Sequence, residues 1–81
     1  MGRKQNDEFD DEVFLKRLGE RIAKIRASKG YSQDRLTLES GLSRGTLSKI
    51  EAAKVSSKTV TLARVAHTLE VPLRKLFDIE L

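Results

Sequence analysis

Short hydroxyl and cationic side chains gather in the stretch GLSRGTLSKIE, residues 41–51. They supply hydrogen-bond donors and positive charge at close spacing, which is chemistry suited to holding an anion rather than to making or breaking covalent bonds. Apolar residues recur on only one side of the stretch, at the spacing of a narrow helical stripe. The candidate binding residues on the other side are Ser43, Arg44, Ser48 and Lys49.

The sequence contains no set of residues that matches a known catalytic or metal-binding arrangement. His67 is the only histidine and cysteine is absent, so the chain cannot assemble a disulfide or a thiolate metal site. No acid at a suitable position completes a catalytic triad with a serine and His67. We therefore expect no enzyme activity, no metal and no cofactor.

Positive charge is concentrated in the middle of the chain. The net charge is +4, but residues 1–20 sum to −2, residues 21–58 to +6 and residues 59–81 to zero. Such a concentration favours a polyanionic partner. The alternative is a solvated basic face without a partner.

The 81 residues suffice for one small domain. No apolar run approaches the roughly 18 residues that span a membrane, and the polar start MGRKQNDEFDDE is unlike a secretory signal. Together with the lack of cysteine, this predicts a soluble cytoplasmic protein without a membrane partner.

Helical spacing of apolar residues predicts an all-α domain of five short helices. Residues 1–9 are expected to be a flexible polar tail, and residues 10–81 the folded domain. Capping and stop signals place the five helices as follows: Asp10 or Asp11 to about Lys29, Gln33 to about Ser40, Ser43 as cap to about Ala52, Thr59 to Leu69, and a last helix after Pro72.

The inward positions of these helices form the expected core. They are Phe14, Leu18, Ile22, Ile25, Leu36, Leu42, Leu47, Ile50, Leu62, Val65, Ala66, Leu69, Leu73, Leu76 and Phe77.

Helix, short turn at Gly41 and second short helix make the layout of a helix-turn-helix. From residue 22 to residue 77 the sequence resembles the Cro/lambda-repressor-type helix-turn-helix domain, also called the XRE family. The resemblance rests on the segments IR…KGYSQ, LSRGTLSKIE and LEVPLRKLF. It implies a compact lambda-repressor-like fold that binds DNA.

The resemblance also implies roles for matching positions. Gln33 matches a residue that hydrogen-bonds a DNA phosphate from the start of the second helix. Arg26 and Glu51 match an ion pair that joins the first helix to the end of the third. Ser43 and Arg44 match positions that meet base edges, and Thr46 and Lys49 match positions that contact the DNA backbone or groove.

An expected third helix with small outer residues could lie deep in the major groove, which is about 12 Å wide. Gly45 would sit inside that helix at a cost of about 1 kcal/mol, which we interpret as the cost of close approach to DNA. Arg44 has the fork that fits the O6 and N7 acceptors of guanine. We predict base contacts from Ser43, Arg44, Ser48 and Lys49. We predict contacts to the DNA backbone from Gln33, Thr46, Lys54, Ser56, Ser57 and Lys58.

Three residues depart from the family pattern. Thr37 stands where alanine is common, and its hydroxyl could bond back to the Gln33 carbonyl. Ala53 and Glu70 stand where glycine is common. We therefore expect the third helix to run longer, or to end without a left-handed cap.

One such domain reads only a few base pairs, so we expect a homodimer on a pseudo-palindromic operator. Apolar residues beyond the needs of a small core predict its interface: Val60, Leu73, Ile79 and Leu81. The alternative is that these residues only cover the lower end of the core.

The predicted function is a sequence-specific transcription regulator, most similar to the controller proteins of restriction-modification systems. Because the sequence stops soon after the fifth helix, we expect no sensor domain and regulation by the protein's own concentration. A minimal phage-type repressor and an antitoxin of a toxin–antitoxin pair are the alternatives. RNA polymerase or a toxin would be the corresponding protein partners.

Overall fold

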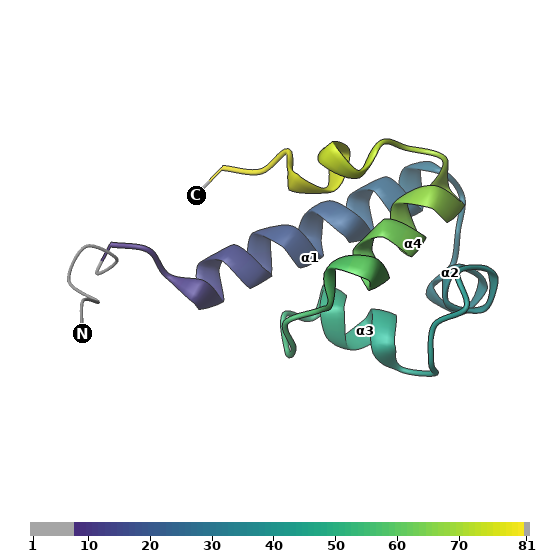
Figure 1. The fold of residues 1–81 in the computed structure, drawn as a ribbon, viewed down its shortest axis with the longest axis horizontal. Helices are drawn as coiled ribbons and strands as arrows, with labels where there is room; N and C mark the ends of the chain where they lie inside the picture. The colour runs from purple at the N-terminus through teal and green to yellow at the C-terminus, as the bar shows by residue number, and fades with distance from the viewer. Residues whose placement is uncertain (1–7, 81) are drawn as a thin grey trace.

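Four α-helices and one short 3₁₀ helix make up residues 8–80, the part of the chain that the computed structural model describes (Figure 1). The prediction of an all-α fold is confirmed, but the count of five α-helices is wrong, because the last helix is 3₁₀. Most of the predicted tail and Leu81 lie outside the described residues. The elements are α1 Asp11–Ser28, α2 Gln33–Glu39, α3 Thr46–Glu51, α4 Thr59–Leu69 and η2 Leu73–Phe77.

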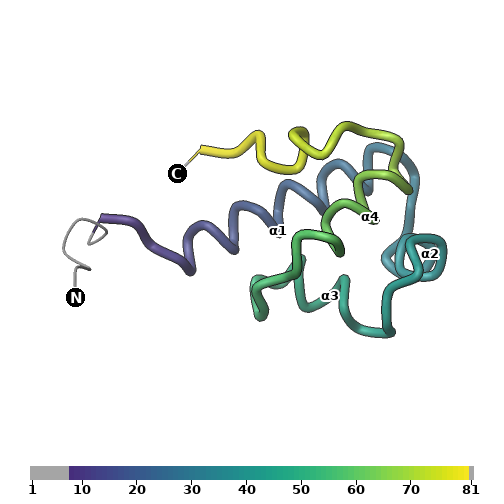
Figure 2. The backbone as a smooth tube through the Cα atoms, in the orientation of Figure 1, coloured from purple at the N-terminus to yellow at the C-terminus, as the bar shows by residue number. Residues whose placement is uncertain are grey.

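Helix α1 runs along the length of the molecule, and two of the other elements pack against it (Figure 1). It contacts α3 and also η2, while α2 lies against α3 and α4. After α4 the chain turns back along α1 (Figure 2). Arg17 holds it there by donating to the Glu80 carbonyl at 2.7 Å, and Arg21 by donating to the Lys75 carbonyl at 2.9 Å.

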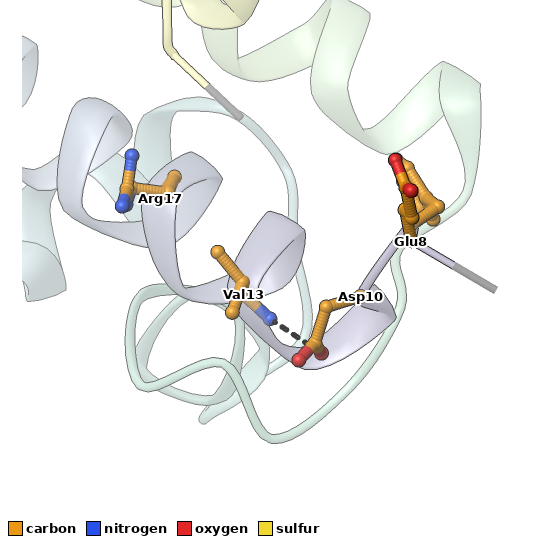
Figure 3. Close-up of a pocket in the computed structure, with 5 residues that line it drawn as sticks. Glu8, Asp10, Val13 and Arg17 are labelled. Atoms are coloured by element: carbon orange, nitrogen blue, oxygen red, sulfur yellow. Dashed lines mark hydrogen bonds between the residues drawn. The ribbon is translucent and has the colours of Figure 1, made fainter.

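The start of α1 follows from its first residues. The Asp10 carboxylate accepts from the backbone N–H groups of Glu12 and Val13, at 2.9 and 3.2 Å, and so caps the helix as predicted. Figure 3 shows the bond to Val13 at the edge of a shallow pocket of about 300 Å³. Acidic residues in the first turn add a favourable interaction with the helix dipole.

The ends of α3 and α4 correct the expectation drawn from the missing glycines. Ala53 and Glu70 adopt the left-handed conformation, with φ of 62° and 60°. After α3, the N–H groups of Ala53 and Lys54 donate to the carbonyls of Ile50 and Lys49, at 3.1 and 2.9 Å. This is the bond pattern of a Schellman cap, so the cap forms at Ala53 although the residue is not glycine.

Replacing Ala53 with Gly should stabilise the protein. The left-handed conformation costs an L-residue about 1–2 kcal/mol, and glycine loses about 0.5–1 kcal/mol of this gain through its freer unfolded chain. A net gain of about 0.5–1 kcal/mol should raise the midpoint of thermal unfolding by a few degrees, measured by circular dichroism. Ala52→Gly is the matched control, because φ of Ala52 is −86° and its replacement should give no gain.

The core is formed by one apolar face from each helix. Among the described residues, the buried apolar side chains that form it are Leu18, Ile22, Ile25, Leu36, Leu47, Ile50, Leu62, Val65, Ala66, Leu69 and Leu76. Phe77 was predicted to point inward but is 42% exposed. In a 3₁₀ helix, residues three apart align, so Leu73 and Leu76 share the inner side and Phe77 is rotated away from it.

Gly19 brings the backbones of α1 and α3 into direct contact. It is buried, and a Cβ added to it would lie 2.6 Å from the carbonyl oxygens of both Ile50 and Glu51. Real Cβ atoms do not approach carbonyl oxygens so closely. Only glycine therefore permits the observed packing of α3 on α1.

Among residues 8–80, no helix combines the length and the apolar character needed to cross a membrane.

Candidate nucleic-acid interface

Helices α2 and α3 and the turn between them form a helix-turn-helix. Ser32 caps α2 by accepting from the N–H of Arg35 at 3.0 Å, as its position before the predicted helix required. Leu36 of α2 and Leu47 of α3 are both fully buried. The inner faces of the two helices are thereby attached to the core, and their outer faces are left to the solvent.

The first turn of α3 differs from the prediction. Ser43 does not cap the helix and Arg44 does not lie in it, because α3 begins at Thr46. The residue before it, Gly45, has φ of 83°, and a Cβ there would meet nothing within 4 Å. Gly45 is therefore needed for a left-handed turn into the helix and does not serve close approach from a helix interior.

The predicted base-contacting residues are all exposed and follow one another along the turn and α3. Ser43 and Arg44 lie in the turn, and Ser48 and Lys49 lie on the outer side of α3. The Ser48 hydroxyl donates to the Gly45 carbonyl at 3.0 Å, which leaves its oxygen free to accept. The strip therefore presents cations at Arg44 and Lys49 and a hydroxyl acceptor at Ser48.

The predicted backbone-contacting residues divide into two groups by exposure. Gln33, Thr46 and Ser57 are half-buried, whereas Lys54, Ser56 and Lys58 are exposed. The three exposed residues belong to the loop between α3 and α4. Lys58 is the residue preceding α4, in an extended conformation and without a side-chain capping bond, so its ammonium is not used by the helix.

A buried carboxylate joins the three helices that surround the turn. Glu51, with a side chain 6% exposed, accepts from Arg26 Nε at 2.8 Å and from Arg26 Nη2 at 3.1 Å. It also accepts from Gln33 Nε2 at 2.7 Å. Arg26 Nη1 donates in turn to the Tyr31 carbonyl at 2.8 Å. The end of α1, the start of α2 and the end of α3 are thus tied at one point, which we call the Glu51 hub (Arg26, Gln33 and Glu51).

The arrangement corresponds to a known domain family. The helix-turn-helix family HTH_3 matches residues 22–76. The chain belongs to the HTH_3 family. The XRE-type resemblance of the sequence is confirmed, and the match takes in α2, α3 and α4 completely.

Two curated relatives of the chain are HTH-type transcriptional regulators. The chain is 45% identical over 64 residues to the HTH-type transcriptional regulator SlrR of Bacillus subtilis, covering 78% of this chain and 42% of SlrR. It is 40% identical over 53 residues to the SPbeta prophage-derived uncharacterized HTH-type regulator YonR of the same species, covering 65% of this chain and 49% of YonR. The chain therefore spans less than half the length of these curated relatives.

A solved structure is similar over nearly its whole length. The restriction-modification controller protein C.AhdI from Aeromonas hydrophila superposes with a TM-score of 0.78 at 31% identity, covering 80% of this chain and 98% of that one.

The HTH_3 match begins at residue 22, so the first part of α1 lies ahead of it. This part contains Gly19, which sequence reasoning overlooked. A glycine in the interior of a strongly helical stripe was the available signal, since glycine there costs about 1 kcal/mol and needs a packing reason.

A second polar cluster lies on the outer side of α2. Arg35 donates to Glu39 at 2.9 Å, its guanidinium carbon lies 3.9 Å from the centre of the Tyr31 ring, and the Tyr31 hydroxyl donates to Glu39 at 3.2 Å. The hydrogen bond between Arg35 and Glu39 raises the pKa of Arg35 and lowers the pKa of Glu39. Arg35 is thereby engaged within the protein. In the part of the chain that is described, no group of His, Cys, Asp and Glu is arranged to hold a metal ion.

Proposed function

We propose that this protein is a transcription regulator that binds double-stranded DNA through its helix-turn-helix, as a homodimer on a pseudo-palindromic operator. The observation that carries the proposal is the exposed basic and hydroxyl strip that starts at Ser43 and continues through α3 to Lys58. The opposite side of α3 is fixed to the core by Leu47 and to α1 at Gly19. A rigidly held helix with a cationic outer face is what major-groove binding requires.

Base recognition is proposed for the turn as well as for α3. Arg44 is exposed two residues ahead of the first residue of α3, where a long side chain can extend beyond the helix end toward a base edge. Its fork matches the two acceptors of guanine. The loop lysines are proposed to contact phosphates, because an ammonium on a flexible stem is a mobile point charge.

A controller protein of a restriction-modification system is the more specific role that we favour. The similarity to C.AhdI extends over nearly all of that protein, whereas the matches to SlrR and YonR are partial. A phage-type repressor is the second candidate, favoured by the match to a prophage-derived regulator.

Arg44→Ala and Lys58→Ala should affect DNA binding in different ways. Loss of a fork that reads guanine should cost about 1–3 kcal/mol per half-site on the preferred operator and relax the preference at one base pair. Loss of a phosphate contact should weaken binding to all sequences about equally. The measurement is a binding titration on an operator selected from random DNA and on its scrambled version.

Each variant is the control for the other, since both remove one exposed cation from the same strip. Equal loss on the two DNAs for Arg44→Ala would make Arg44 a phosphate contact and contradict its proposed role in base reading. If the wild-type protein binds neither DNA, the proposed function is wrong.

The exposure of the apolar residues shifts the proposed dimer interface toward Val60 and Phe77. Leu73 and Ile79 are half-buried against the protein's own core, as the alternative reading of these residues expected. Val60 at the start of α4 is 59% exposed, and Phe77 is 42% exposed. The apolar surface left for a partner subunit is therefore larger at Val60 and Phe77 than at Leu73 and Ile79.

Val60→Asp should weaken self-association while the monomer stays folded, because a carboxylate is costly to bury in an apolar interface but costs little on an exposed side chain. Sedimentation equilibrium gives the dissociation constant of the dimer, and circular dichroism the fold. Val55→Asp is the matched control: Val55 is an exposed valine in the loop after α3, and its replacement should leave association unchanged. Identical dissociation constants for wild type and Val60→Asp would place the interface elsewhere.

A further inference from the structure

The carboxylate of Glu51 has a fixed orientation. Arg26 contacts both of its oxygens with two different nitrogens, a geometry that sets the plane of the carboxylate as well as its position. Arg26 cannot turn away, because its third nitrogen is bound to the Tyr31 carbonyl. The side chains of Arg26 and Glu51 are 17% and 6% exposed, so water competes little for these bonds.

The amide of Gln33 is oriented by this carboxylate. Gln33 is the first residue of α2, and its Nε2 lies 2.7 Å from Glu51 Oε1. A side-chain amide has two N–H donors, and the Glu51 bond uses one of them. The second N–H then has a set direction, whereas a free glutamine side chain would have to lose rotamer freedom to make the same bond.

We propose that Glu51 is a positioning residue for DNA binding: it holds the Gln33 amide so that the second N–H donates to a DNA phosphate. The proposal rests on the proposed function. Glu51 itself does not touch DNA, since its side chain is buried. Its negative charge would repel a nearby phosphate, but the paired guanidinium of Arg26 offsets it. The Glu51 hub thus orients a neutral donor without adding net charge.

A double-mutant cycle in DNA affinity tests this role. Gln33→Leu should weaken binding about tenfold per half-site, the loss expected for a hydrogen bond to a charged group. Glu51→Leu, which leaves no acceptor for the Gln33 amide, should cause a similar loss when Gln33 is present, and less than about a twofold further loss when residue 33 is leucine. A Glu51 that acted only by holding α3 in place would weaken binding equally in both backgrounds, and that result would overturn the proposal.

Glu39→Gln is the matched control. It removes one carboxylate that is paired with an arginine and changes the net charge equally, but Glu39 has no bond to Gln33. Its effect on affinity should be the same with Gln33 and with Gln33→Leu. Failure of the wild-type protein to bind DNA at all would count against the proposed function, and is seen before the cycle begins.

A measurement on the wild-type protein covers the case in which Glu51→Leu does not fold. In the free protein, one Nε2 proton of Gln33 should exchange with solvent at least about tenfold more slowly than in an unfolded peptide, since the bond to a buried carboxylate protects it. Exchange at the unfolded rate would mean that the amide is not held, and the positioning role would be wrong.

Discussion

Raising the salt concentration from about 50 to about 200 mM should lower the affinity of the proposed dimer for DNA by roughly 10³–10⁵. Each neutralised phosphate releases condensed counterions, so the logarithm of the binding constant falls linearly with the logarithm of the salt concentration. The exposed strip contains Arg44, Lys49, Lys54 and Lys58 on each subunit. Two subunits therefore bring eight cations to the DNA surface, a number within the range of about 6–10 charge contacts that gives a fall of this size.

Fluorescence anisotropy with a labelled operator at a series of salt concentrations measures the slope. Lys54→Ala and Lys58→Ala should each reduce the slope by about one contact per subunit. Glu39→Gln, which alters charge away from the strip, should leave the slope nearly unchanged. A flat titration for the wild-type protein would contradict DNA binding by this surface.

Gly19→Ala should destabilise the protein by about 3 kcal/mol, at the upper end of the usual cost of overpacking. The added methyl group would meet the Ile50 and Glu51 carbonyl oxygens at 2.6 Å, and backbone atoms cannot rotate away as a side chain does. The better helix propensity of alanine recovers only about 1 kcal/mol. Since 1 kcal/mol corresponds to about 4–8 °C in a domain of this size, the midpoint of thermal unfolding should fall by more than about 10 °C.

Gly45→Ala is the matched control for the steric part of this effect. Its Cβ would have open space, so only the left-handed backbone resists alanine, at about 1–2 kcal/mol. Chemical denaturation gives both free energies of unfolding. If Gly19→Ala cost no more than Gly45→Ala, the tight packing of α3 on α1 would be wrong.

Much of the fold could be predicted because its signals are local. Asp10 and Ser32 are strong N-cap residues, and α1, α2 and α4 lie within about one residue of their predicted bounds. The predicted start of α3 was wrong because it relied on the same kind of local signal. Ser43 is also a good N-cap residue, and nothing in its neighbours distinguishes a glycine inside a helix from one with positive φ. The prediction that Phe77 points inward was wrong, because the sequence patterns of α and 3₁₀ helices differ little over five residues.

The residue types of the candidate site could be predicted from the sequence, but the hydrogen bonds and packing contacts between its helices could not. Exposed cations and hydroxyls at the third helix follow from the pattern, and the pairing of Arg26 with Glu51 from the resemblance. The bond from Gln33 to Glu51 joins residues 18 positions apart on different helices. The contact at Gly19 joins α1 to backbone atoms of α3. Neither leaves a periodic signal, because each depends on how the helices pack.

The close contact between Gly19 of α1 and the backbone of α3 has a consequence for protein engineering. On the side of α3 it consists of carbonyl oxygens, which every amino acid possesses. The packing of α3 against α1 at Gly19 therefore does not depend on the side chains on the outer surface of α3. New DNA specificities can be sought by randomising the four proposed base-contacting residues in a library, with the rest of the protein left unchanged: Ser43, Arg44, Ser48 and Lys49. Such a library should be rich in folded members, as long as Gly19 is retained in all of them.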